Sequence, residues 1–265
     1  MVDERTGRSM EKPEHISEQY DQELDSIRSQ VLAMGGIVED QIRDAALALL
    51  DSNTLLADGV VEADIQVNTM EVQIDHACTQ LIARRQPTAR DLRLVVSILK
   101  TITDLERIGD EAEKIAKLSY ELARLEPPAT RFIEIKHLSG HVRSMLHNAL
   151  NAFARMDAQA ALKIIAEDKE VDREYDAVMR QLMTIMMEDP RSIRRVLNTM
   201  WSARALERIG DHAKNICEYI VYSVHGTDIR HIGFEQKQRY ARTLEGQMAE
   251  APDAETSTDQ PPEET

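Results

Sequence analysis

Two pairs of carboxylates are the residues of this chain that are best placed to do chemistry. Glu106 and Asp110 are four residues apart, and Glu207 and Asp211 repeat the same spacing. At that spacing two side chains share one face of a helix, where like charges destabilise an isolated helix by about 0.2–0.5 kcal/mol. Clustered carboxylates persist when they share protons, meet arginine or hold a cation. The doubled pair therefore predicts either a cation site or a network of salt bridges.

In the first half of the chain, another polar row is expected to face this pair. Pro87 turns the chain between two helical segments, because proline disfavours helix in the residue before it. At equal distances from this turn, Asp110 falls opposite Asp64. By the same count Glu106 falls opposite Asn68, which offers only a neutral carbonyl. The first half is thus predicted to gather three carboxylates and one amide.

The second half repeats this arrangement around Pro190. When the two flanking helices fold on each other there, Glu207 falls opposite Asp172. Asp211 falls opposite Asp168, so the second patch has four carboxylates. Since affinity for a hard cation grows with the number of anionic ligands, we expect the second patch to bind more tightly.

Oxygen ligands favour Mg²⁺, Ca²⁺, Mn²⁺ or iron over a zinc ion held by sulfur. We interpret the two patches as metal sites. The alternative is a solvated face on which the acids form salt bridges with Arg107, Arg208 and Lys114. Gly109 and Gly210 stand beside the carboxylates, although glycine inside a helix costs about 1 kcal/mol relative to alanine. They provide either close packing of a neighbouring helix or space for an ion, and the sequence does not separate the two.

Other candidates for chemistry are weaker. His137 and His141 have the spacing of a metal-binding pair, but an exposed pair without a ligand is the simpler interpretation. We interpret His212 as a surface residue. A basic patch at one end of the bundle could hold phosphate or pair with local acids such as Asp91, and it consists of Arg84, Arg85, Arg90 and Arg93.

An internal duplication positions both patches. Residues 105–110 are identical to residues 206–211, which follow 101 positions later. Upstream, residues 64–68 resemble residues 168–172 at an offset of 104. Two matches in the same order at nearly the same spacing indicate two repeats of roughly 100 residues each.

Apolar residues at helical spacing, interrupted by turn signals, predict three helices in each repeat. The fold class is therefore all-α, with two tandem, duplicated three-helix bundles. The helices are expected at about 16–50, 56–83, 89–125, 133–155, 158–187 and 192–224. We assign the repeats to 14–126 and 129–226, a disordered N-terminus to 1–13, and an acidic, disordered tail to 234–265.

Composition supports this assignment and excludes some functions. Hydrophobic residues make up 42% of the chain but aromatics only 4%, which is typical of helix bundles. The formal net charge of −15 argues against direct DNA binding and against adsorption to an anionic membrane. Cys78 and Cys217 lie in helical patterns, so we expect buried thiols and no disulfide. Without a signal peptide or an apolar run of about 20 residues, we expect a cytoplasmic protein that reaches membranes only through partners.

These motifs resemble the PhoU family, the accessory regulators of bacterial phosphate-specific transport. The resemblance covers about residues 16–233 and rests on the doubled LERIGD, on RQPTARDLR at 85–93 and on MGGIVE at 34–39. It implies tandem three-helix bundles and multinuclear metal sites built on E/DxxxD motifs, with manganese, magnesium, iron or zinc as candidate ions. Asn68 departs from the acidic pattern. The residues carried over as metal ligands are Asp64, Glu106, Asp110, Asp168, Asp172, Glu207 and Asp211.

The resemblance also implies a function without catalysis. Such proteins repress the phosphate-starvation response when phosphate is plentiful, and they form homodimers. They link the Pst phosphate transporter, through its ATPase PstB, to the sensor kinase PhoR, which is then held in its phosphatase state. The main alternative is a carboxylate-bridged metal enzyme in a helical bundle, which would need an open coordination position and a nearby base. A second alternative is a helical scaffold whose acids are merely solvated.

Overall fold

Helical periodicity continues through nearly all of the chain that the computed structural model describes, namely residues 13–125, 133–233, 235–237, 239–241 and 243. The predicted all-α fold is confirmed, and no strand occurs among these residues. Residues 1–12 and 244–265, to which we assigned a disordered N-terminus and most of an acidic tail, lie outside the described residues. The long helices are α1 (Pro13–Asp51), α2 (Thr54–Arg85), α3 (Ala89–Ala123), α4 (Ile133–Arg155), α5 (Ala158–Glu188) and α6 (Ile193–His225).

Local signals account for where these helices begin and end. Asn53 caps α2, because its side chain accepts hydrogen bonds from the backbone N–H groups of Leu55 and Leu56. Gln86 ends α2 in the left-handed conformation, directly before Pro87. Asp157 caps α5 in the same way as Asn53 caps α2. The observed ends lie within three residues of the predicted ones.

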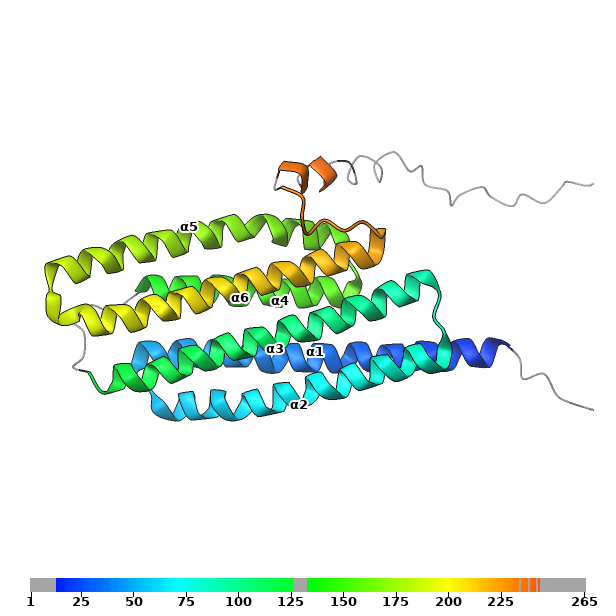
Figure 1. Ribbon diagram of the computed structural model, residues 1–265, viewed down its shortest axis with the longest axis horizontal. Helices are drawn as coiled ribbons and strands as arrows, with labels where there is room; N and C mark the ends of the chain where they lie inside the picture. The colour runs from blue at the N-terminus through cyan, green and yellow to red at the C-terminus, as the bar shows by residue number, and fades with distance from the viewer. Residues whose placement is uncertain (1–12, 126–132, 234, 238, 242, 244–265) are drawn as a thin grey trace, which may run out of the picture. The chain divides into compact units, whose positions relative to one another are not determined.

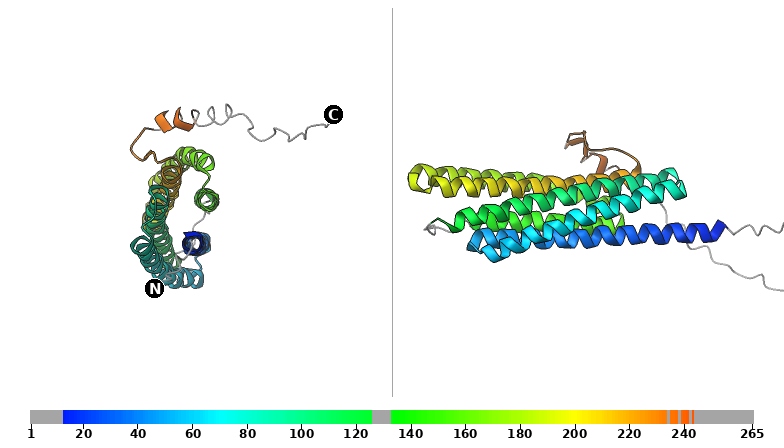
Figure 2. Two further views of the ribbon diagram at one scale, coloured as in Figure 1. Left: turned by 90° about the vertical axis from the view of Figure 1, so that its right-hand side faces the viewer. Right: turned by 60° about the horizontal axis from the view of Figure 1, so that its bottom comes forward.

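The described residues as far as Arg230 form one compact unit, and those from His231 onward form a second. In the first unit, the six helices lie side by side along one axis (Figure 1). Each repeat is a three-helix bundle, α1–α3 or α4–α6, and the repeats meet where α3 packs on α6 and α1 on α4. The end-on view in Figure 2 shows α1 and α4 on the same side of the layer that holds α3 and α6.

The core is aliphatic, as the composition indicates. Equivalent positions of α3 and α6 are fully buried in both repeats, for example Leu105 and Leu206, or Ile108 and Ile209. Both cysteines are buried free thiols, as predicted. None of the described helices is long and apolar enough to span a membrane.

Candidate functional site: two carboxylate clusters

The first carboxylate cluster joins α2 to α3. Asp64 of α2 is only 7% exposed, and its Oδ2 atom accepts a hydrogen bond of 3.0 Å from the amide of Asn68. The α2–α3 hairpin brings Asp64 into electrostatic contact with Asp110 and with Glu106, as the distance from the turn predicts. Two acids that were not among the predicted site residues also belong here. The charge of Glu113 acts on Asp64, and the charge of Glu71 acts on Glu106. The first cluster therefore consists of Asp64, Glu71, Glu106, Asp110 and Glu113.

These carboxylates hold their negative charge at a cost. Burial raises the pKa of Asp64, and the charges of Glu113 and Asp110 raise it further. Burial likewise raises the pKa of Glu106, with Asp110 and Glu71 adding to the effect. Within the described residues, no salt bridge joins Asp64, Glu106 or Asp110 to a basic side chain. The first cluster thus has the charge that a bound cation would neutralise.

Two buried oxygen atoms of this cluster have no hydrogen-bond donor. Neither Oδ1 of Asp64 nor Oε1 of Gln41 has a partner within the described part of the chain. The Gln41 amide lies close enough to lower the pKa of Asp64, but its nitrogen donates to the Val60 carbonyl at 3.3 Å. Both oxygens lie 3.1 Å from the position that a Cβ atom on Gly109 would take. Gly109 therefore opens onto two oxygen atoms that lack a positive or hydrogen-bonding partner.

The donor chemistry of the first cluster fits a hard cation, since carboxylate and amide oxygens are its preferred ligands. The side chains do not form a closed coordination shell, because in the described ranges no three or more His, Cys, Asp or Glu residues are grouped so as to hold a metal ion. An ion at this position would therefore require the amide oxygen of Gln41 or a new rotamer of a nearby glutamate. A metal ion at the first cluster therefore stays a prediction.

The second carboxylate cluster already contains a cation. It comprises Asp168, Asp172, Glu207 and Asp211, as predicted, together with Lys214. The Nζ atom of Lys214 lies 2.7 Å from Oδ2 of Asp168 and 2.9 Å from Oδ1 of Asp211. Burial alone would lower the pKa of Lys214, but the hydrogen bonds to these two carboxylates outweigh it and raise the pKa. Lys214 therefore neutralises the position that a metal ion would occupy.

The two clusters differ by one exchange of charge at equivalent positions. Lys214 stands 101 residues after Glu113, so a lysine replaces a glutamate of the first cluster. The expectation of tighter binding at the second patch counted carboxylates alone and omitted this lysine. Arg204 also approaches Glu207, at 2.8 Å, although Oε2 of Glu207 remains buried without a partner among the described residues. With Lys214 included, the second cluster has less net negative charge than the first.

The two repeated glycines also have different surroundings. A Cβ atom on Gly210 would lie 3.2 Å from a methyl group of Val171 and 3.6 Å from one of Val142. Gly210 thus provides close packing, whereas Gly109 opens onto the oxygens of Asp64 and Gln41. Close packing is thus the observed role of Gly210, and space for an ion beside Gly109 stays a prediction.

Two of the three basic residues proposed as salt-bridge partners for these acids pair elsewhere, whereas the charge of the third, Arg107, acts to lower the pKa of Glu106. Arg208 and Lys114 lie 2.7 Å and 2.9 Å from the same oxygen of Glu111, a residue that the sequence reasoning did not select. Glu111 is buried where α3 meets α6. The solvated-face alternative is thus wrong for these two cations.

His212 is not a surface residue. It is 8% exposed, and its Nδ1 atom lies 2.6 Å from Oδ1 of Asp104, which is also buried. The amide of Asn215 donates to the same oxygen at 3.2 Å. The prediction was wrong because α3 of the first repeat covers His212. Aligning the two helices of one hairpin gives no information about contacts between the repeats. The Asp104–His212 pair joins the two repeats.

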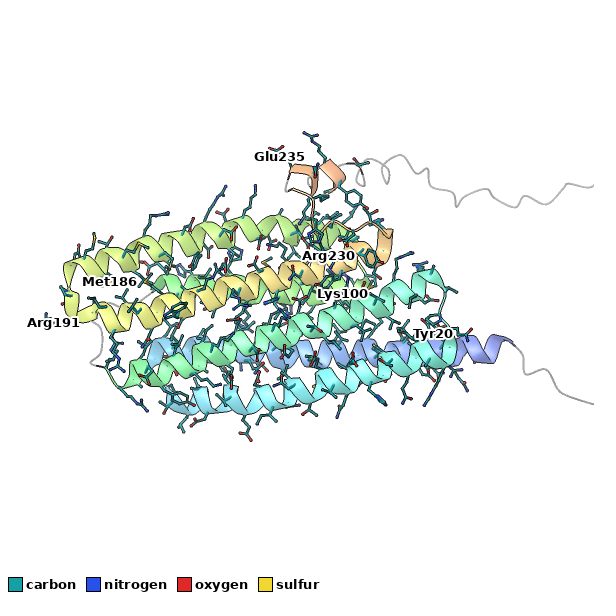
Figure 3. All side chains as sticks on the ribbon, viewed as in Figure 1. Tyr20, Lys100, Met186, Arg191, Arg230 and Glu235 are labelled. Atoms are coloured by element: carbon teal, nitrogen blue, oxygen red, sulfur yellow. The ribbon has the colours of Figure 1, made fainter. Side chains whose placement is uncertain are left out.

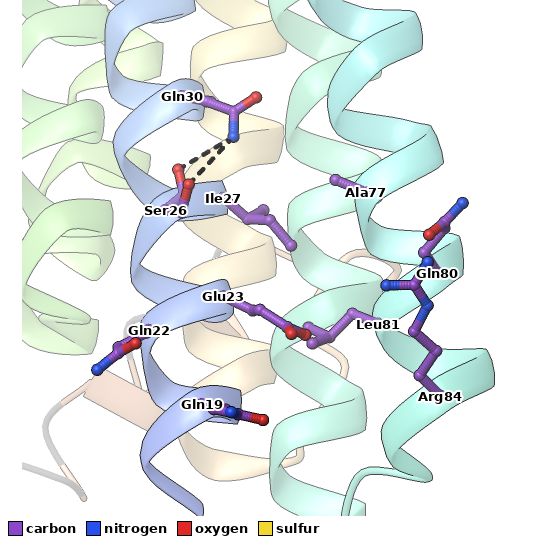
Figure 4. A pocket seen from close by; sticks show the side chains of 10 residues that line it. All are labelled: Gln19, Gln22, Glu23, Ser26, Ile27, Gln30, Ala77, Gln80, Leu81 and Arg84. Atoms are coloured by element: carbon purple, nitrogen blue, oxygen red, sulfur yellow. Dashed lines mark hydrogen bonds between the residues drawn. The ribbon is translucent and has the colours of Figure 1, made fainter. Parts of the chain in front are cut away.

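Within the arginine patch, Arg85 pairs with α1 and not with Asp91. Arg85 contacts Glu23 at 2.8 Å and Gln19 at 3.2 Å, whereas Asp91 accepts a hydrogen bond from Thr88. Figure 4 shows the residues that line the adjacent hollow between α1 and α2. The hollow measures about 630 Å³, and four of its ten lining residues are glutamines while one, Arg84, is basic. This lining provides no convergent set of cations for phosphate. The other weak candidate, His141, lies 3.0 Å from Glu174.

The sequence of this chain matches a known protein family in both repeats. The PhoU domain family matches residues 31–119 and again residues 135–220, one match for each repeat. The "Phosphate-specific transport system accessory protein PhoU homolog" of Pseudomonas aeruginosa is 50% identical over 233 residues, which is 88% of this chain and 96% of that protein. The accessory protein PhoU of Escherichia coli K12 is 50% identical over 229 residues, covering 86% and 94%.

Solved structures agree with this assignment. The crystal structure of PhoU from P. aeruginosa has a TM-score of 0.76 at 51% identity and covers 78% of this chain and 100% of that chain. The phosphate transport system regulatory protein PhoU from Streptococcus pneumoniae has a TM-score of 0.74 at 30% identity, covering 79% and 99%. The chain therefore belongs to the PhoU family, whose members are accessory and regulatory proteins and not enzymes.

Proposed function

We propose that this chain regulates phosphate uptake and represses the phosphate-starvation response when phosphate is plentiful. The observation that carries the proposal is the 50% identity, over 88% of the chain, to a relative described as an accessory protein of phosphate-specific transport. The relatives' names support a role in the regulation of phosphate transport. The repression of the starvation response is our addition to that role. The chain would act in the cytoplasm as an adaptor, without catalysis of its own.

Two partners follow from this role. The first is the ATPase of the phosphate transporter, of the PstB type, and the second is a sensor kinase of the PhoR type. Contact with both proteins would let the chain hold the kinase in its inhibitory, phosphatase state while transport proceeds. We also propose that the chain acts as a homodimer. Its net charge of −15 is consistent with binding proteins in preference to nucleic acid or anionic lipid.

A metal ion belongs to the same proposal. Asp64, Glu106 and Asp110 would hold it together with the buried oxygen of Gln41. An ion of this kind, manganese, magnesium, iron or zinc, would neutralise the first cluster and stabilise the contact of α2 with α3. At the second cluster, Asp168, Asp172, Glu207 and Asp211 could hold an ion only if Lys214 were displaced.

The partner assignment can be tested with purified proteins. The full chain is titrated against the transport ATPase and against the cytoplasmic part of the sensor kinase, and binding is measured by calorimetry. We expect binding to both, and we expect the kinase to dephosphorylate its response regulator faster when the chain is present. Absence of binding to both proteins would contradict the adaptor role, and analytical ultracentrifugation of the chain alone tests the dimer.

A further inference from the structure

Three large apolar side chains form an exposed row on α6. Ile193, Leu197 and Trp201 are 40%, 43% and 65% exposed, and their spacing of four residues places them on one face of the helix. Trp201 is the only tryptophan of the chain. The row begins next to Arg191, at the end of the bundle where Figure 3 labels Met186 and Arg191. Single exposed apolar residues are ordinary on protein surfaces, but an aligned row that ends in tryptophan is typical of an interaction site.

This row borders a hollow between two helices. The hollow measures about 740 Å³ and lies where α3 packs on α6. Trp201 and Ala205 line it from α6, and Leu118 lines it from α3. Charged side chains, which include Glu111 and Glu121, flank these apolar ones, and the groove is large enough to admit side chains of a partner.

Five cations surround the groove, although the chain as a whole is strongly acidic. Their side chains are between 45% and 68% exposed, and each pairs with a carboxylate that is less exposed than the cation. Glu111 and Glu207, for example, are 4% and 13% exposed. Most of these carboxylates are therefore covered more than their cations, although Glu121 is itself 38% exposed. The surrounding cations are Lys114, Lys117, Arg194, Arg204 and Arg208.

We propose that this surface, the Trp201 face, binds an acidic amphipathic helix of a partner protein. The Trp201 face comprises the apolar row, the groove and the five cations. A helix lying along α3 and α6 would place an apolar side chain in the groove beside Trp201 and its carboxylates against the cations. Tryptophan and arginine are the residues that most often dominate binding energy at interfaces, and complementary charge selects the partner. The inference rests on the adaptor function and identifies the surface that performs it.

The test compares variants of the full chain for binding to the ATPase and the kinase. Trp201→Ala removes the anchor, and Arg194→Glu reverses the charge of a cation whose partner, Glu121, is itself exposed. Lys117, Arg204 and Arg208 are left unchanged, because they pair with buried or partly buried glutamates. The matched controls are Val72→Ala, an apolar residue of α2 that is 66% exposed, and Lys163→Glu, an exposed lysine of α5.

We expect Trp201→Ala and the charge reversal each to weaken binding of at least one partner by about 10-fold or more. The control variants should bind as the wild type does, and all variants should keep the wild-type melting temperature to within a few degrees. A photo-crosslinker placed at Leu197 should attach to a helical segment of that partner with more acidic than basic residues. The same crosslinker at Ile65 on α2 should not attach to that segment.

The outcomes separate this inference from the proposed function. If the wild type binds neither partner, the adaptor role itself is contradicted, and the inference is lost with it. If the wild type binds and both Trp201 face variants bind equally well, the adaptor role stands and the Trp201 face is wrong. Attachment of the Leu197 crosslinker to a second copy of the chain, or to a segment without net negative charge, would also overturn the inference.

Discussion

Lys214 lies 2.7 Å from Asp168, so the second repeat contains its own cation within its carboxylate cluster. The equivalent position of the first repeat is Glu113, which pairs with Lys117 at the edge of its cluster, while Asp64, Glu106 and Asp110 have no salt bridge to a basic side chain within the described residues. The two repeats therefore differ in the charge of their clusters. In the second cluster Lys214 pairs with two of the carboxylates, and the first cluster has a glutamate at the equivalent position.

The first prediction therefore concerns metal binding at the two clusters. Added Mn²⁺ or Mg²⁺ should raise the melting temperature of the chain, because an ion that binds only the folded state stabilises it. Replacing Glu106 and Asp110 by alanine should remove most of this increase, and replacing Glu207 and Asp211 should remove less. Equal increases in the wild type and both double variants, with no metal found by mass spectrometry, would show that these acids do not hold an ion.

Removing Lys214 should convert the second cluster into a metal-dependent one. In chelator, Lys214→Ala leaves the partly buried Asp168 without its cation, which should lower the free energy of unfolding by about 2 kcal/mol or more. Mn²⁺ should restore much of that loss, as measured by urea unfolding with and without metal. Lys163→Ala, at an exposed position of α5, is the control and should have little effect in either condition. If metal leaves the stability of Lys214→Ala unchanged, the second cluster cannot accept an ion in place of the lysine.

Alanine at the two repeated glycines should have opposite effects. Gly210→Ala meets the buried methyl group of Val171 at 3.2 Å, and such overpacking costs typically about 1–3 kcal/mol, which exceeds or cancels the gain in helix propensity of about 1 kcal/mol. Gly109→Ala meets the ends of the Asp64 and Gln41 side chains at 3.1 Å, which can give way by rotation, and a methyl group of Val67 at the ordinary contact distance of 3.5 Å. In chelator it should therefore equal or exceed the stability of the wild type.

The same pair of variants distinguishes packing from metal binding. Gly109→Ala should lose the increase in melting temperature on adding Mn²⁺, and Gly210→Ala should retain it. Thermal unfolding of both variants with and without metal measures this difference. A Gly109→Ala variant that is stabilised by metal as strongly as the wild type would place the ion elsewhere.

The pH dependence of stability should reveal the strain at Asp64. Burial and the neighbouring Glu113 and Asp110 raise its pKa above the ordinary value of 3.8. Its favourable contribution to folding is therefore complete below the ordinary pKa and is lost as the pH rises through the raised value. Asp64→Asn cannot ionise and keeps a carbonyl for the hydrogen bond from Asn68. In chelator it should be more stable than the wild type at about pH 7, and the difference should shrink toward about pH 4.

Urea unfolding of both proteins at a series of pH values checks this sign. A difference that grows as the pH falls would mean that ionised Asp64 is stabilised in the folded protein. Glu113→Gln serves as a second variant. It removes one of the charges that raise the pKa of Asp64. The pH range over which ionisation of Asp64 lowers stability should therefore be narrower in Glu113→Gln than in the wild type.

The fold could be predicted from local signals, because each helix end has a short-range cause. Asn53 and Asp157 cap helices, and Pro87 and Pro190 mark the hairpin turns. The meeting of Asp64 with Asp110 followed from the same information, since two antiparallel helices joined by a short turn must align residues at equal distances from it. Lys214 also had a signal, its i,i+3 spacing from Asp211, which a count of carboxylates alone overlooked.

Contacts between the repeats had no such signal. Asp104 and His212 are 108 residues apart, and their pairing depends on how α3 packs on α6. Gln41 likewise reaches the first cluster from α1, a helix that is not part of the α2–α3 hairpin. Long-range packing of this kind depends on the summed fit of whole helix faces, which no short motif encodes.

The most direct measurement of the regulatory role is a reporter of the phosphate-starvation response in phosphate-rich medium. Cells from which the gene for this chain has been deleted should express the alkaline-phosphatase reporter strongly, and a plasmid copy of the wild type should silence it again. Trp201→Ala should restore silencing poorly, whereas Val72→Ala should restore it fully. A deletion that leaves the reporter silent at high phosphate would contradict the conclusion that this chain represses the response.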